Sequence, residues 1–257
     1  AVGADAGAGA DQRVYVYGIV PSDVETMSDA RGVGEPPAEV FVVRHGDIAA
    51  LVSRIDPDTS LGAPEDLAAH EALLDAAVTE SPVLPVRFGA VMTGEDVVAD
   101  ELLAAYHDEF AAALDELEGK AEFVVQGRYD LDAVLHEIFD KDTEVARLRE
   151  VIRGKPETAT RRERVAIGER VSNIITARQN ADTQMVVKAL TDLGAPVTIR
   201  APTHDEDALH VACLIELADR PELESRIDQI ARTWSGRVSV RLLGPFAPYD
   251  FVTTTRE

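Results

Sequence analysis

The run "RVYVYGIV" at residues 13–20 is the feature that most limits how this chain can fold. Most of its residues are β-branched or aromatic, and apolar side chains occur at odd and even positions alike. Such a run favours a central strand whose two faces are both buried. The stretch "EVFVVRHGDIAALV" (39–52) then predicts two short strands joined by a turn at His45-Gly46-Asp47.

Two helices complete the first half of the chain, and the apolar residues of each recur at helical spacing. Pro64 is expected to open the first helix, with Leu67, Leu74 and Val78 on one face. The second helix is expected to end at Gly119, and its apolar stripe consists of Leu103, Tyr106, Phe110, Ala113 and Leu117. With a further strand between these helices, the first half is predicted to hold four strands and two helices.

The second half predicts the order strand, long helices, strand, strand, helix, strand. This is the βαββαβ order of a ferredoxin-like sheet, here with an enlarged first helical layer. The expected strands lie at 122–126, 195–202, 209–217 and 236–244, and the expected helices lie at 131–152, at 171–193 and from Pro221 onward.

Because each half combines strands with helices, we predict an α+β protein. Its 257 residues are enough for two domains, each with a modest core. The boundary is expected near Gly119–Lys120. The predicted division is a flexible leader at 1–12, an N-terminal α+β domain at 13–119, a C-terminal ferredoxin-like α+β domain at 120–243 and a C-terminal tail at 244–257.

The charge of the chain narrows the classes of partner. Its 47 acidic and 25 basic residues give a net charge of −22, which repels nucleic-acid phosphates and anionic lipid. No apolar run approaches the roughly 18 residues that a membrane span needs. We expect neither nucleic acid nor membrane as a partner. A single cysteine excludes an internal disulfide framework and any multi-cysteine metal site, and it fits a cytoplasmic protein.

Two histidine-containing segments could carry chemistry. His70 is followed by Glu71 on the first helix, but neighbouring helical residues diverge by about 100° and form no dyad. A histidine with satisfied hydrogen bonds is the better interpretation than a general base. The segment "THDEDALH" (203–210) has neither zinc nor calcium spacing and is interpreted as an acidic turn. We predict no catalytic residue, no cofactor and no metal.

The segment "SPVLPVRFGAV" (81–91) combines strand character with two prolines and one charge. Proline is confined to the edges, starts and bulges of sheets, so Pro82 and Pro85 place a strand at Val83–Phe88 on an edge, or delay its pairing until after Pro85. Arg87 is expected to meet a carboxylate from the acid-rich helices, for example that of Glu71 or Glu80. Phe88 either presents its ring to a partner or helps to lock the core of the first domain.

The closing segment "GPFAPYDFV" (244–252) is the second stretch of this kind. Pro245 and Pro248 are expected to interrupt strand pairing, so that an extended tail must place its rings elsewhere. The rings of Phe246, Tyr249 and Phe251 either pack back across their own domain or dock on a partner.

Four stretches in order resemble the gas vesicle protein F/L family, and the chain is identified as an actinobacterial-type member. They are "YVYGIV" (15–20), "HEALLDAAVTESPVLPVRFG" (70–89), "LHVACLIEL" (209–217) and "LLGPFAPYDFV" (242–252). The chain departs from the family pattern at Ala247, where a proline is usual, and at Gln126, where the family often has lysine.

The resemblance implies a fold and a function. The fold is two domains, each a modified ferredoxin-like sheet with helices, plus an extended C-terminal tail. The function is non-enzymatic: assembly of gas vesicles, or a minor structural role in them, by binding the hydrophobic shell protein and other accessory vesicle proteins. The protein is then cytoplasmic until it reaches the vesicle. A charged protein that covers an apolar shell subunit keeps it from aggregating.

Two alternatives remain at this stage. Ferredoxin-like sheets host many functions, so the chain could be a small-molecule enzyme or a ligand-binding module. It could also be a scaffold for other partners, with the helix from Val171 to Leu193 as its docking face.

Overall fold

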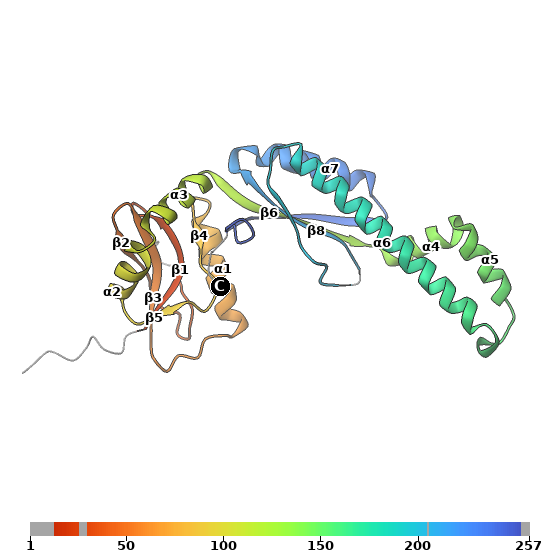
Figure 1. Ribbon diagram of the computed structural model, residues 1–257, viewed down its shortest axis with the longest axis horizontal. Helices are drawn as coiled ribbons and strands as arrows, with labels where there is room; N and C mark the ends of the chain where they lie inside the picture. Colours follow the sequence, from red (N-terminus) through yellow and green to blue (C-terminus); the bar gives the residue numbers. More distant parts are fainter. Residues whose placement is uncertain (1–12, 26–29, 205, 253–257) are drawn as a thin grey trace, which may run out of the picture. The chain divides into compact units, whose positions relative to one another are not determined.

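The computed structural model describes residues 13–25, 30–204 and 206–252 (Figure 1). By its contacts the chain divides into two compact units. The first unit holds the described residues up to Glu122, the segment Leu214–Ala218 and the residues from Gly244 onward. The second unit holds Phe123–Cys213 and Asp219–Leu243. The predicted leader at 1–12 lies outside the described residues, and the predicted domain boundaries stay a prediction.

The first unit contains an antiparallel sheet with strand order β2-β3-β1-β4, in which β5 also pairs with β1. Its strands are β1 (Arg13–Pro21), β2 (Val40–His45), β3 (Ile48–Ile55), β4 (Leu84–Pro85) and β5 (Val91–Met92). The predicted hairpin is confirmed, because β2 and β3 are joined at Gly46-Asp47 and Gly46 has a φ of +60°. Glycine suits this left-handed turn, since it has no Cβ to clash.

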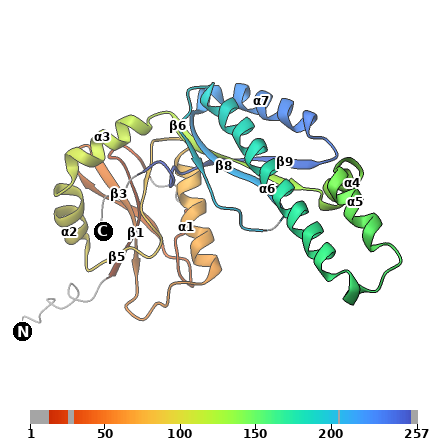
Figure 2. The same cartoon turned by 45° about the vertical axis from the view of Figure 1, so that its right-hand side comes forward.

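Helices cover both faces of this sheet, with α1 on one side and α2 to α3 on the other (Figures 1 and 2). Their bounds are α1 (Pro64–Ala77), α2 (Glu95–Val97), the π-helical segment η1 (Val98–Ala104) and α3 (His107–Leu117). Residues of β1 alternate between the two helical layers. Tyr15 contacts His70 of α1, whereas Val14 and Val16 belong to the core cluster that includes Leu103 and Leu114. This double burial explains why "RVYVYGIV" is apolar on both faces.

The predicted second helix of the first half is interrupted by the π-helical segment. Its backbone gains one residue per turn, so that Val98 and Leu103, five residues apart, are both fully buried. The expected apolar stripe holds for Leu103 and Leu117, which are buried, while Tyr106 and Phe110 are half-buried. Periodicity at the α-helical spacing does not reveal such a change of pitch.

The second sheet has strand order β7-β8-β6-β9. Its strands are β6 (Lys120–Tyr129), β7 (Val197–Ile199), β8 (Asp207–Glu216) and β9 (Val238–Phe246). Helices α6 and α7 lie side by side on one face of this sheet (Figures 1 and 2). The helical elements of this half are α4 (Leu131–Lys141), α5 (Thr143–Ile152), η2 (Glu157–Ala159), α6 (Arg161–Thr191), η3 (Leu217–Asp219) and α7 (Arg220–Thr233). The predicted combination of α and β structure is confirmed, with two antiparallel sheets.

Strand β9 continues further than the sequence predicts. Pro245 was expected to end pairing, yet the strand reaches Phe246. This expectation is wrong because β9 lies at the edge of its sheet, where a residue without an N–H can face away from the ladder. The segment after the strand therefore begins at Ala247.

A buried hydrogen-bonded group beside Gly32 links Tyr17 of β1 and Ser53 of β3 to the backbone of Val33 and Glu39. The hydroxyl of Tyr17 donates to Ser53 Oγ at 2.9 Å and accepts the N–H of Val33 at 2.9 Å. Ser53 Oγ in turn donates to the carbonyl of Glu39 at 2.8 Å. Every polar atom of this group has a partner, as burial requires. A Cβ on Gly32 would collide with the Tyr17 hydroxyl and lie 2.6 Å from Ser53 Oγ.

We expect Gly32→Ala to lower the free energy of unfolding by roughly 1–3 kcal/mol, because an added methyl overpacks this site and breaks its hydrogen bonds. Gly168→Ala is the matched control, since a Cβ there meets nothing within 4 Å inside helix α6. Gly168→Ala should raise the free energy of unfolding by up to about 1 kcal/mol, because alanine favours the helix more than glycine does. Urea unfolding followed by circular dichroism measures both, and a neutral Gly32→Ala would contradict the packing described.

Candidate functional site

The segment 81–92 lies at the edge of the first sheet, as its prolines predict. Between Ser81 and Ala90 only Leu84 and Pro85 form a strand, opposite Ile19 and Gly18 of β1, and Val91 and Met92 then form β5. The alternative, that pairing starts only after Pro85, is wrong. Pro85 is buried and Pro82 half-buried, so both lie where the segment turns into the first unit.

Arg87 does not form the expected ion pair. The side chain is exposed, and the structure records no ion pair between it and either Glu71 or Glu80, all three of which are described. An exposed arginine keeps its hydration, and a surface ion pair adds little to stability, so nothing draws these side chains together. Arg87 is available to solvent or to a partner.

The side chains of His70 and Tyr15 form hydrogen bonds with the backbone of the residues that follow β4. His70 Nε2 lies 3.1 Å from the carbonyl oxygen of Val86, and its Nδ1 lies 2.8 Å from the Tyr15 hydroxyl. That hydroxyl also accepts the N–H of Gly89 at 3.1 Å. A carbonyl can only accept, so Nε2 carries the proton, and Tyr15 then donates to Nδ1. The two side chains thus hold Val86 and Gly89 on either side of Arg87 and Phe88.

Burial sets the ionisation of this pair. His70 is only 1% exposed, and burial lowers the pKa of its imidazole below the usual value. Burial likewise raises the pKa of Tyr15 to about 12. His70 is therefore neutral near pH 7, and both of its nitrogens are hydrogen-bonded within the fold, as in a structural histidine.

Phe88 closes this aromatic group from the outside. Its ring centroid lies 5.8 Å from that of His70 and 6.1 Å from that of Tyr15, at steep interplanar angles. The ring is half-buried, so one part packs on the core and the rest stays accessible. Both of the roles considered for Phe88 remain compatible with this position.

A groove of about 490 Å³ opens beside Phe88. We call it the Phe88 groove, and it is lined by Arg13, Ile55, Thr59, Leu61, Phe88, Gly89, Val91, Met92 and Thr93. Val91 is 40% exposed in the short edge strand β5. The lining is mainly apolar, with one cation at Arg13, which suits an apolar peptide segment better than a charged metabolite.

The residues after β9 pack within the first unit. Ala247 donates its N–H to Asp75 Oδ1 at 2.9 Å, and Asp250 donates its N–H to Glu122 Oε2 at 3.0 Å. The ring of Tyr249 lies 6.4 Å from His70. The prediction that the closing segment packs across the C-terminal domain is therefore wrong, because two carboxylates of the first unit, half-buried Asp75 and buried Glu122, accept its backbone N–H groups.

The aromatic residues of this segment are only partly covered. Phe246 ends β9, and Phe246, Tyr249 and Phe251 are all half-buried. The Tyr249 hydroxyl is buried without a hydrogen-bond partner among the described residues. Burial, and then the nearby charge of Asp75, raise the pKa of this phenol. The sequence pointed to these rings, but it contained no signal for Asp75 and Glu122, whose roles depend on distant contacts.

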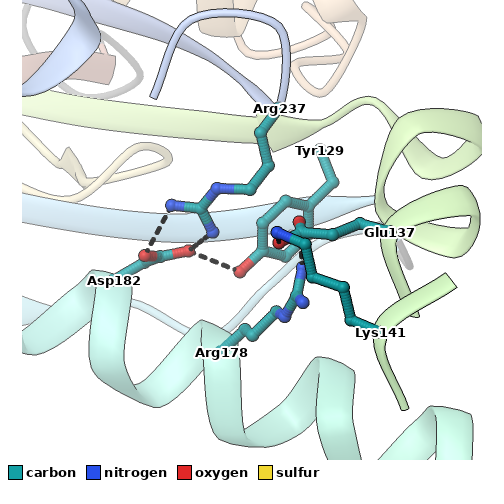
Figure 3. Close-up of polar contacts among 6 residues, drawn as sticks. All are labelled: Tyr129, Glu137, Lys141, Arg178, Asp182 and Arg237. Atoms are coloured by element: carbon teal, nitrogen blue, oxygen red, sulfur yellow. Dashed lines mark hydrogen bonds and ion pairs between the residues drawn. The ribbon is translucent and has the colours of Figure 1, made fainter. Parts of the chain in front are cut away.

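A second polar group lies in the other unit (Figure 3). Arg237 forms two hydrogen bonds with Asp182 of α6, at 2.7 and 3.0 Å, and Tyr129 of β6 donates to the same carboxylate at 2.8 Å. The Asp182 hydrogen bond raises the pKa of Arg237, and burial raises the pKa of Tyr129. A carboxylate engaged by three donors is held in place and has little capacity left for a ligand.

Next to it, α4 and α6 are joined by a further set of charges. Glu137 accepts from Lys141 at 3.0 Å and from Arg178 at 2.8 Å, and these two bonds lower the pKa of its carboxyl (Figure 3). These contacts secure the packing of α4 on α6. The polar groups around Asp182 and Glu137 were not predicted from the sequence. The signal for them is that Arg178 and Asp182 interrupt the apolar face of α6.

Neither metal-binding nor membrane-spanning features are found in the described chain. Within residues 13–25, 30–204 and 206–252, no three His, Cys, Asp or Glu side chains gather as metal ligands would. Over the same ranges, no helix combines the length and apolar character needed to cross a bilayer. In the segment 203–210, Asp207 is buried and accepts from Thr203 and from the N–H of His204.

Comparison with known proteins gives one consistent family. The family model described as gas vesicle synthesis protein GvpL/GvpF matches residues 13–253. Gas vesicle protein F of Streptomyces sp. (strain CB03234) is 30% identical over 241 residues, which cover 93% of this chain and 98% of that protein. Gas vesicle protein L of the same strain is 27% identical over 264 residues, covering 96% of this chain and 95% of that protein.

The fold is also that of a solved structure. The crystal structure of the gas vesicle protein GvpF from Anabaena sp. PCC7120 aligns with a TM-score of 0.80 at 22% identity. The alignment covers 95% of this chain and all of that one. At 22% identity this likeness shows the fold alone. Membership of the family is shown by the family model and by the Streptomyces relatives.

The contact between Asp75 and Ala247 has a pH dependence of defined sign. Burial raises the pKa of Asp75 from 3.8 to about 6, the Ala247 N–H opposes this, and the charge of Glu71 adds to it. Because the folded state binds this proton more tightly, Asp75 stabilises the fold most at low pH, and stability is lost as pH rises through 6.

We expect Asp75→Asn to raise the free energy of unfolding at pH 8, by about 1 kcal/mol after allowance for the half-exposed site, with no gain near pH 4. The amide keeps an oxygen for Ala247 but no charge. Asp66→Asn is the opposite control, since the N–H groups of Gly34, Gly62 and Ala63 lower the pKa of Asp66 and its charge stabilises at neutral pH. Urea titrations at both pH values test this, and a destabilised Asp75→Asn at pH 8 would contradict it.

Proposed function

Because this chain belongs to the gas vesicle synthesis protein GvpL/GvpF family, we propose that it acts in vesicle assembly by binding the hydrophobic shell protein and other vesicle accessory proteins. The observation that carries the proposal is the family match over residues 13–253. We further propose that it performs no chemical reaction and that it works in the cytoplasm until it reaches the vesicle.

We infer that both units are modified ferredoxin-like sheets. In each sheet the strands stand in the order second, third, first, fourth along the chain, as β2-β3-β1-β4 and β7-β8-β6-β9. In the second unit the elements also follow the βαββαβ order. The first unit has no helix between β1 and β2 within its described residues, which is its modification. The residues after β9 form the C-terminal tail of this scheme.

The Phe88 groove is the surface we assign to the shell protein. A shell subunit that faces gas must expose apolar side chains, and such patches associate non-specifically in water. The groove offers Phe88, Val91 and Met92 at a sheet edge that prolines keep short. Because His70 and Tyr15 hold the segment rigid, little conformational entropy is lost when a partner binds. In this proposal Pro82 and Pro85 shape the site, and Arg87 lies at its rim.

The alternative of a small-molecule enzyme has less support. It needs polar side chains that converge on a pocket and keep free hydrogen-bonding capacity. Two of the polar groups with shifted pKa values, around His70 and around Asp182, are satisfied by their own neighbours. Their shifts are explained by burial and structural ion pairs.

We expect Val91→Asp to weaken binding of the shell protein at least about tenfold, because it places a charge in the apolar groove. The measurement is the fraction of co-expressed shell protein that stays soluble and is retained with the affinity-tagged chain. Ile199→Asp is the matched control, since Ile199 is 54% exposed in β7, outside the groove. It should bind like the unchanged protein.

Two outcomes would count against separate parts of the proposal. If the unchanged chain retains neither the shell protein nor any other vesicle protein, the binding function is wrong. If it retains the shell protein and Val91→Asp retains it equally well, the function stands and the assignment to the Phe88 groove is wrong.

A further inference from the structure

Helix α6 is covered along only part of its length. Its fully buried side chains are Asp182, Val186 and Leu190, all in the second half. From Arg161 to Ala181 no side chain is fully buried, although this half contains Val165 and other branched apolar residues. The sequence suggested a docking face at Val171–Leu193, but the latter part of that range packs within its own unit. The accessible part lies nearer the start of the helix.

This part of the chain reverses the charge of the rest. Between Thr143 and Arg178 there are nine Arg or Lys and five Glu residues, a net charge of +4 in a chain of −22. We call these residues, from α5 through the first half of α6, the basic arm. Helices α5 and α6 lie next to each other there (Figure 1). A local excess of one sign on a protein of the other sign is a basis for specific association.

Several cations of the basic arm lack an internal counter-ion. Arg147 pairs with Glu144 and Arg170 with Asp142. Lys155, Arg161 and Arg162 are exposed, and no carboxylate within the described part of the chain pairs with them. Arg161 and Arg162 line an open groove of about 660 Å³ together with apolar Val165, which is 53% exposed. The groove also includes Thr158, Ala159, Glu163, Ala166 and Glu169. Charge and apolar surface thus occur together.

The same chain carries a surface of opposite character. Residues 95–118, which form α2, η1 and α3, contain nine Asp or Glu and no Lys or Arg. Glu95 pairs with Arg54 and Asp108 with His107. The other seven are exposed, and the described residues supply no cation for their side chains: Asp96, Asp100, Glu101, Glu109, Asp115, Glu116 and Glu118. We call this surface the acidic face. Its opposite side covers the first sheet.

We propose that the basic arm of one copy of this protein binds the acidic face of a second copy. Each copy then keeps one arm and one face free, so the contact is heterologous and builds chains or rings. The net charge of −22 opposes association at long range, but at about 0.15 M salt charges separated by more than about 8 Å are screened. Directly apposed arginines and carboxylates keep their attraction. This contact does not depend on the proposal for the shell protein.

A second copy suits the arm better than phosphate-bearing partners do. Glu163 and Glu169 line the same groove as the two arginines, and they would repel nucleic acid or anionic lipid. On a protein surface the same glutamates can accept hydrogen bonds, while Val165 packs against apolar side chains. Half-buried Tyr106 and the exposed Ala104, Ala105 and Ala112 lie among these residues and provide such side chains.

Analytical ultracentrifugation of the full chain tests the proposal. We expect concentration-dependent association at about 0.15 M salt that weakens at about 1 M salt. Arg161→Glu/Arg162→Glu should weaken it at least about tenfold, and so should Asp115→Lys/Glu116→Lys, since each double change turns attraction into repulsion. Mixing the two variants should restore association, because the intact arm of the Asp115→Lys/Glu116→Lys variant can bind the intact face of the Arg161→Glu/Arg162→Glu variant.

The control is Arg232→Glu/Arg241→Glu, which makes the same change in net charge at two exposed arginines outside the arm. It should associate like the unchanged chain. A monomer at every concentration overturns the proposal, and so does equal weakening by the control or failure of the mixed variants to associate. Arm-dependent binding to vesicles with about one-third anionic lipid, without self-association, would identify a lipid surface instead.

Discussion

The hydrogen bonds of His70 and Tyr15 replace the strand pairing that proline removes from the edge of the first sheet. The N–H of Val86 still donates to Tyr17 of β1, and the chain bonds to β1 again at Ala90. In between, two backbone groups, the carbonyl of Val86 and the N–H of Gly89, find partners on buried side chains. Buried backbone groups without partners are costly, so these bonds decide whether the segment has one conformation. The position of Phe88 and the shape of its groove follow from them.

This arrangement answers why a strand-like apolar run contains two prolines and a charge. The prolines limit pairing to two residues and keep the edge from recruiting another strand. Arg87 points to solvent between the two anchored residues, so its charge needs no buried partner. A neutral His70 suits this structural role, because a charged imidazole could not accept from Tyr15. The local sequence signals thus describe an anchored loop more than a strand.

Many helices and strands of this fold could be predicted from local sequence patterns. The alternation at 39–52, the proline that opens α1 and the glycine after α3 are local signals, and the structure confirms the elements they predicted. The π-helical turn at Val98–Ala104 and the continuation of β9 through Pro245 depend on tertiary contacts, which local rules do not contain. The candidate site divides in the same way. Phe88 and Tyr249 could be selected as aromatic residues beside prolines, whereas Asp75 and Glu122 acquire their partners from residues more than a hundred positions away.

The two proposed binding surfaces differ in the physical force on which they depend, and this difference bears on how an assembly factor can work. An apolar groove binds through burial of surface, which salt weakens little, whereas the basic arm binds through charge, which salt screens. Copies joined through their arms would present several grooves at once, and linked sites raise the effective concentration of each without a new contact. A weak groove repeated along a chain of copies can therefore hold an aggregation-prone subunit and still release it site by site. Because the two surfaces depend on different forces, a change in salt can alter self-association while the groove keeps its affinity for the shell protein.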